Sequence, residues 1–109
     1  MKQMVELLNE IGLPFAYDHF GEGHAPDPPF ICYLYPQSDN FSADGIAYLK
    51  KNQVSLELYA DQKNIELEQQ VEAVLDSYRI FYNKSEVYID SEKMYEILYQ
   101  FTLEVNHEK

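Results

Sequence analysis

The chain has 109 residues and a formal net charge of −11, from 19 acidic and 8 basic side chains. This length predicts a single domain over residues 1–109, and the acidic balance argues against specific nucleic-acid binding and against anionic membrane surfaces, because both depend on Lys and Arg. The lone Cys32 cannot form an internal disulfide, and the absence of a signal peptide or a long apolar run predicts a chain made in a reducing cytoplasm.

A helix is predicted at the N-terminus, where apolar residues recur at the spacing of one helix face: Met4, Leu7, Leu8 and Ile11. Gly12 follows as a candidate C-terminal cap, because glycine tolerates the left-handed conformation that such caps adopt. Pro14 then prevents the helix from resuming.

All nine glycines and prolines lie between Gly12 and Gly45. Because these residues punctuate regular structure, this stretch is predicted to be heavily turned. It is divided into a short strand, a long loop, an apolar strand that Pro36 ends or places at an edge, and a polar loop: Phe15–Phe20, Gly21–Pro29, Phe30–Tyr35 and Gln37–Gly45.

The remainder of the chain is predicted to be regular. Strict alternation predicts a strand through Val54, Leu56, Leu58 and Ala60, extending back toward Ile46. A helix follows, with Asp61 as its candidate cap and an apolar stripe formed by Leu67, Val71, Val74, Leu75 and Tyr78. The last segment is predicted to be a hairpin with a turn at 90–92 and a strand whose alternate positions are Tyr95, Ile97, Tyr99, Phe101, Leu103 and Val105.

These elements predict an α+β fold. Its expected form is a mostly antiparallel four- to five-stranded sheet with two helices packed on one face, in the order α-β-β-β-α-β-β. The long loops are expected at about 21–29 and 37–45.

Three acidic residues, Glu68, Glu72 and Asp76, stand four apart on the second predicted helix. Like charges at this spacing weaken a helix slightly, so the stripe is interpreted as a solvated face.

A search for catalytic chemistry finds none. Cys32 lies within an apolar strand pattern and lacks the flanking sequence of a nucleophile. His19 and His24 match no strong metal-binding spacing, even with Asp18, Glu22 or Asp27 nearby. There is no phosphate-binding glycine motif, so no catalytic residue, cofactor or metal is predicted, and the protein is not expected to be an enzyme.

Several linked segments resemble the small minor tail and tail-completion proteins (head–tail joining, tail terminator-like) of long-tailed phages and prophages of Gram-positive bacteria: 14–20 (PFAYDHF), 25–34 (APDPPFICYL), 40–45 (NFSADG), 57–59 (ELY), 71–75 (VEAVL) and 84–89 (KSEVYI). The resemblance implies a non-enzymatic structural protein without a cofactor, at or near the head–tail junction. It implies other tail or connector proteins as partners and a homo-oligomeric ring such as a hexamer. A hypothesis that follows from such a ring is that Glu68, Glu72 and Asp76 line a channel through which DNA passes, since a negative lumen would not grip phosphates. It also implies the host bacterial cytoplasm during assembly and the virion tail afterwards.

On this interpretation the turned stretch supplies subunit contacts rather than an active site, because long loops on a rigid scaffold often carry function. The candidate subunit-interaction residues are His19, Phe20, His24, Asp39, Asn40, Phe41 and Asp44. The alternative is an acidic DNA-mimic inhibitor that binds a host nucleic-acid enzyme. Such a mimic should space its acids like phosphates along one surface.

Overall fold

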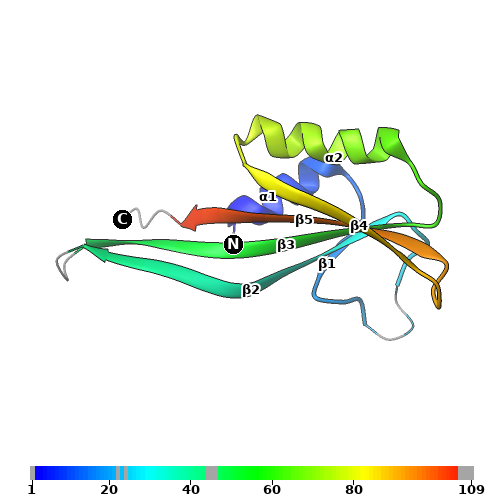
Figure 1. Ribbon diagram of the computed structural model, residues 1–109, viewed down its shortest axis with the longest axis horizontal. Helices are drawn as coiled ribbons and strands as arrows, with labels where there is room; N and C mark the ends of the chain where they lie inside the picture. Colours follow the sequence, from blue (N-terminus) through cyan, green and yellow to red (C-terminus); the bar gives the residue numbers. More distant parts are fainter. Residues whose placement is uncertain (1, 22, 24, 44–46, 106–109) are drawn as a thin grey trace.

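The computed structural model describes residues 2–21, 23, 25–43 and 47–105 and confirms the predicted α+β order. The elements are α1 (Lys2–Ile11), β1 (Phe15–Tyr17), β2 (Phe30–Ala43), β3 (Ala47–Ala60), α2 (Ile65–Ser77), β4 (Tyr82–Ile89) and β5 (Met94–Val105). The strands form one sheet in the order β1-β2-β3-β5-β4, parallel only between β1 and β2. Both helices lie on the same face of the sheet (Figure 1).

The core lies between the helices and this covered face. Its sheet side is built from alternate residues of the central strands, such as Leu56 and Leu58 of β3 and Ile97 and Tyr99 of β5, all almost fully buried. The helix side comprises the predicted stripes: Met4, Leu7, Leu8 and Ile11 from α1, and Leu67, Val71 and Leu75 from α2. Removing these apolar surfaces from water is the main favourable term in folding.

The end of α1 is fastened to α2. Gly12 adopts φ +88°, the left-handed conformation expected of its position, and its N–H donates to the carbonyl of Leu8 at 3.2 Å. The side-chain amide of Gln70 donates to the carbonyl of Ile11 at 2.7 Å. One of the carbonyls that a helix end leaves unpaired is therefore bonded by the neighbouring helix.

The cap of α2 is Asn64 rather than the predicted Asp61. The Asn64 side chain accepts a hydrogen bond from the N–H of Leu67 at 3.0 Å, and the helix begins at Ile65. Asp61 is too far from the first turn to do this, and its side chain is exposed.

Replacing Asn64 by Ala is expected to lower the free energy of unfolding by about 1 kcal/mol, because it leaves a helix N–H without its partner. The matched change Asp61→Ala should cost a few tenths of a kcal/mol at most. Urea denaturation of both variants checks this. An equal loss in the two would contradict the assignment of the cap.

The predicted loop at 37–45 is wrong as far as Ala43, because these residues continue β2. They pair with β3 in an unbroken antiparallel register from Gln37 opposite Gln53 to Ala43 opposite Ala47. The polar side chains suggested a loop, but the partner strand supplies the backbone hydrogen bonds whatever the side chains are. We call residues 37–43 and 47–53 the hairpin arm, and it reaches past both helices along the 50 Å axis of the molecule (Figure 1).

Two other boundaries differ from the prediction. Pro36 does not end β2: it lies where the β2–β3 register shifts, between Leu34 and Gln37, beyond the last residue that β1 covers. Proline is tolerated there because its missing N–H is not needed at an outer edge or bulge. β1 ends at Tyr17 rather than Phe20, because Asp18 turns the chain with φ +68°.

Candidate functional site

The predicted interaction residues fall into two groups at opposite ends of the sheet (Figure 1). Beside the end of β1, His19 is exposed and its ring bonds the Asp18 carboxylate at 3.0 Å. Phe20 is half-buried and meets the ring of Phe30 edge-on, with centroids 5.3 Å apart. Phe20 therefore helps to fix the loop onto the sheet.

The second group lies on the hairpin arm. Asp39, Asn40 and Phe41 are consecutive residues of β2, opposite Lys51, Lys50 and Leu49 of β3. His24 and Asp44 lie outside the described residues. The structure thus places three of the candidates on a projecting ribbon instead of the expected loop.

The acidic stripe on α2 is not the solvated face that the spacing suggested. Glu68 is only 3% exposed, and its carboxylate bonds the Lys63 ammonium at 2.7 Å and the Lys84 ammonium at 2.8 Å. Lys84 also bonds Glu72 at 2.6 Å, and Lys63 also contacts Glu86. These side chains form an ion-pair network that joins α2 to β4.

Tyr99 of β5 connects the network to the sheet, because its buried hydroxyl donates a hydrogen bond to Glu72 at 2.8 Å. Burial would raise the pKa of Glu68, but hydrogen bonds and attraction from Lys63 and Lys84 outweigh it and lower that pKa. Sequence reasoning missed both lysines, because nothing local links Lys84 on a strand to an acid on a helix. Of the three acids in the stripe, Asp76 alone is exposed to solvent, as the spacing predicted.

In the part of the chain that the structure describes, no helix lies on the other face of the sheet, and we call it the open face (Figure 1). The register places Glu57 of β3 and Glu96 of β5 there as diagonal neighbours, with Tyr59 directly opposite Glu96. Both carboxylates are half-buried, and within the described chain neither has a cationic partner. The Tyr59 hydroxyl donates a hydrogen bond to the carboxylate of Glu57 at 3.0 Å.

Burial is the main cause of an elevated pKa for each of these carboxyl groups. The pKa of Glu57 is raised by desolvation and by Asp18, against a lowering by the hydrogen bond from Tyr59. The pKa of Glu96 is raised by desolvation and by the charge of Glu57. Ionisation of these two carboxyl groups therefore costs free energy in the folded protein.

Replacing Glu96 by Gln is expected to stabilise the protein at neutral pH, by roughly 0.2–1 kcal/mol, the range for like charges across a strand pair. A carboxyl whose folded-state pKa is raised binds its proton more tightly in the folded state, so its charge destabilises the fold above that pKa. The gain in the free energy of unfolding should become smaller as the pH falls through the raised pKa of Glu96 toward the ordinary value of 4.5. Thermal unfolding from pH 4 to 8 checks this, and a pH-independent difference would contradict it.

Cys32 lies buried on the same face, near Glu57. Desolvation, followed by the charges of Glu57, Asp18 and Glu96, raises its pKa to about 11. Reactive thiols need a depressed pKa, so this one is suited to packing and not to nucleophilic chemistry.

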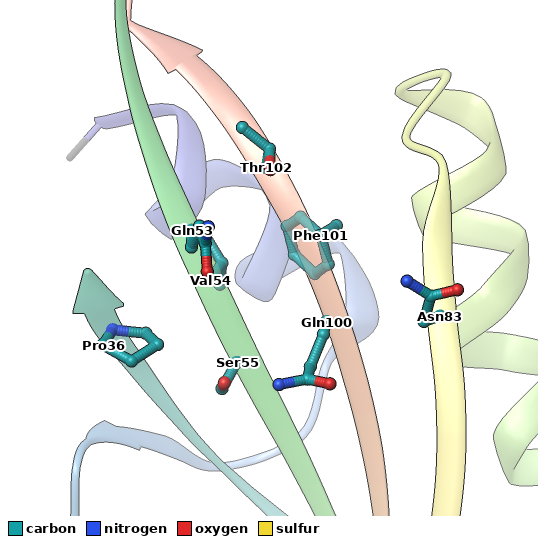
Figure 2. A pocket seen from close by; sticks show the side chains of 8 residues that line it. All are labelled: Pro36, Gln53, Val54, Ser55, Asn83, Gln100, Phe101 and Thr102. Carbon is teal, nitrogen blue, oxygen red and sulfur yellow. The ribbon is translucent and has the colours of Figure 1, made fainter. Parts of the chain in front are cut away.

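The open face also contains a polar hollow of about 270 Å³ (Figure 2). It lies next to the two carboxylates in the direction of the strands. Side chains from β3, β4 and β5 line it, among them Ser55, Asn83 and Gln100. Ser55 lies opposite Gln100 in the register, and the Glu57–Leu98 pair lies two residues further along the same two strands. The hollow and the carboxylates are therefore consecutive parts of one surface.

In the described part of the chain, no three His, Cys, Asp or Glu side chains are grouped so that they could hold a metal ion. None of the helices in that part is long and apolar enough to cross a membrane. Among the described residues, the ion pairs are those of the network between α2 and β4 and the Asp18–His19 pair, while Glu57 and Glu96 lie close together without a cation.

No family model matches this chain, and no curated protein is detectably similar to it in sequence. Its fold is similar to that of a chain in the solved structure described as the virion of a native gene transfer agent (GTA) particle. The TM-score is 0.56, with 13% sequence identity, over 91% of this chain and 83% of that one. At this identity the likeness shows a common fold.

Proposed function

We propose that this protein is a non-enzymatic structural subunit of a phage or prophage tail, which acts at or near the head–tail junction as a tail-completion or tail-terminator subunit. The observation that carries the proposal is the fold shared with a chain of a GTA virion, over most of the length of both chains. It agrees with the sequence segments that resemble tail-completion proteins. Fold alone does not define function, so the surfaces of this chain supply the rest of the case.

The hairpin arm is the feature that suits a subunit of a ring. It projects beyond the helices, and β1 leaves the outer edge of β2 uncovered after Tyr33. Such an edge offers backbone donors and acceptors to another chain. A projecting element that meets a different surface of the next copy gives a head-to-tail contact, which closes into a ring when the rotation allows it.

The acids on α2 do not support the DNA-mimic alternative or the channel hypothesis. Glu68 and Glu72 are bonded to lysines of the same chain, so their charge is largely compensated. A surface that imitates DNA or lines a channel would present uncompensated carboxylates in regular array. Replacing Glu68 and Glu72 should therefore affect folding before it affects any contact with DNA.

The proposal is tested by deleting the gene from a prophage that encodes this chain and examining the induced lysate by electron microscopy. Filled heads and separate tails, with infectivity restored by the gene supplied in trans, are the expected result. Complete, infectious particles in the deletion strain would refute the proposal.

A further inference from the structure

The strand β4 lies at one end of the sheet, and its outer edge is free. It comes last in the strand order and pairs on its inner side with β5 over all eight of its residues, without a register shift. In the part of the chain that the structure describes, no strand pairs with its outer side. A long, regular edge of this kind presents unpaired N–H and C=O groups to any strand that can reach it.

The usual devices that protect a sheet edge are missing from β4. The strand contains no proline and no bulge. Its two charged side chains are bonded elsewhere. Lys84 bonds Glu68 and Glu72 of α2, and Glu86 contacts Lys63. These charges are therefore engaged in the network and do not guard the edge against another strand.

Exposed apolar side chains gather along the same edge. Six large hydrophobic residues of the described chain are exposed, and three of them lie on β4 or directly before it: Phe81, Val87 and Tyr88. Phe81 is 90% exposed and lines a hollow beside the start of the strand. Apolar side chains grouped at an unpaired edge are typical of a surface that another chain covers.

We infer that the outer edge of β4 pairs with the hairpin arm of a second copy of this chain, through residues 37–43 of that copy. The arm offers a matching edge, because β1 covers β2 only as far as Tyr33. The strand directions also match, since β2 and β5 run one way and β3 and β4 run the other. Copies related by a rotation about an axis along the strands therefore place β4 antiparallel to β2, the more stable kind of pairing.

The arm and β4 of one chain do not meet, because they lie at opposite ends of the strand order and at different levels along the strands. The arm begins where Gln37 lies opposite Gln53, whereas β4 begins with Tyr82 beside Phe101, which lies opposite Val54. Contact between copies therefore requires a stagger along the strand direction. Such a stagger tilts the strands relative to the axis of the ring, as it does in closed sheets generally.

Charge favours this pairing over a contact between two β4 edges. The net charge of the chain is −11, yet the arm carries two of its eight basic side chains and one of its 19 acids. The acidic remainder of a neighbouring copy therefore attracts the arm, although two whole copies repel each other. Two β4 edges would bring two acidic bodies together without this compensation.

This inference rests on the proposed function, because it names the contact that joins the copies of a ring. The test titrates one variant into another and follows the labelled one by heteronuclear NMR. The labelled protein lacks the arm: Asn40 is joined to Lys50 through an Asn-Gly turn, and β4 is unchanged. The unlabelled partner keeps the arm and carries Phe81→Ser/Val87→Lys, so that its own edge is weakened.

We expect amide shifts centred on residues 81–89 of the labelled protein, with a dissociation constant on the order of 1 mM or below. An unlabelled partner that also lacks the arm should cause no such shifts, because the arm supplies the pairing strand.

Introducing Phe81→Ser/Val87→Lys into the labelled protein as well should weaken binding at least about tenfold. The fold should persist, because Phe81 is almost fully exposed and Val87 lies opposite Glu96, which can pair with a lysine. The matched control, Val5→Ser/Ile65→Ser, removes two exposed apolar side chains of the helices and should leave binding unchanged.

Three results would overturn the inference: no shifts at residues 81–89, equal shifts with a partner that lacks the arm, or equal weakening by both double variants. Equal shifts without the arm would assign the edge to a contact between two β4 strands. Any of these results would leave the proposed role in a tail standing, with the arm bound to another surface. Complete, infectious particles in the deletion strain would instead refute that role and leave the pairing unaffected.

Discussion

Shortening the hairpin arm is expected to abolish particle assembly while leaving the fold intact. The variant joins Asn40 to Lys50 through an Asn-Gly turn and removes residues 41–49. Asn40 and Lys50 are register partners, so a two-residue turn can close the shorter hairpin. All β3–β5 pairs are retained, because that ladder begins at Lys50.

Residues 41–43 pair with residues 47–49 and not with β5, so the transition temperature should change by only a few degrees. If the arm supplies the main contact between subunits, infectious titre should fall on the order of a hundredfold or more, the effect of losing an interface hot spot. Complementation of the deletion strain measures titre, and circular dichroism measures folding. A folded variant that restores normal titre would show that this part of the arm makes no essential contact.

Replacing Lys84 by Met is expected to lower the free energy of unfolding by about 2 kcal/mol. The change leaves Glu68 with a single cation and Glu72 with none, although both carboxylates stay largely buried. Loss of one partner from a buried ion pair costs about 3–5 kcal/mol, and the partial exposure of Lys84 reduces this.

A double-mutant cycle with Glu68→Gln separates the ion pair from lost packing. The coupling energy should be about 1 kcal/mol or more, and a value near zero would contradict the network. The stability that comes from a lowered Glu pKa is present above the ordinary value of 4.5 and is lost as the pH falls. The difference in the free energy of unfolding between the Lys84→Met variant and the unchanged protein should therefore become smaller at acidic pH.

Periodicity predicts the helices and strands that bury one face in the core, because the buried positions of such an element are apolar at a regular spacing. The alternation of Val54, Leu56 and Leu58 and the helical spacing of Leu7 and Ile11 follow from burial on one face, so both elements appear where expected. Strict alternation likewise locates β5.

The errors at the α2 cap and at the end of β1 are local, but the larger errors share one cause: they depend on partners distant in the chain. The outer half of β2 is polar and is held by hydrogen bonds to β3, which Ser38 and Asp39 do not reveal locally. Glu68 is buried because Lys84 arrives from another strand. The open face is similar: Glu57 and Glu96 look like ordinary solvent-facing positions until the register makes them neighbours.

The candidate interaction residues remain a prediction, and the sequence indicates them only as a stretch of chain. The crowding of glycine and proline located it, but the structure divides it into a packed loop that carries Phe20 and a projecting arm that carries Phe41.

A tail-completion subunit is found at the junction of head and tail in the assembled particle. Cryo-electron microscopy of purified particles, with a small tag fused to this chain, tests it most directly. We expect extra density in a ring of copies at the junction of head and tail. Tag density on the capsid shell or tail tip, or particles that lack the chain altogether, would contradict it.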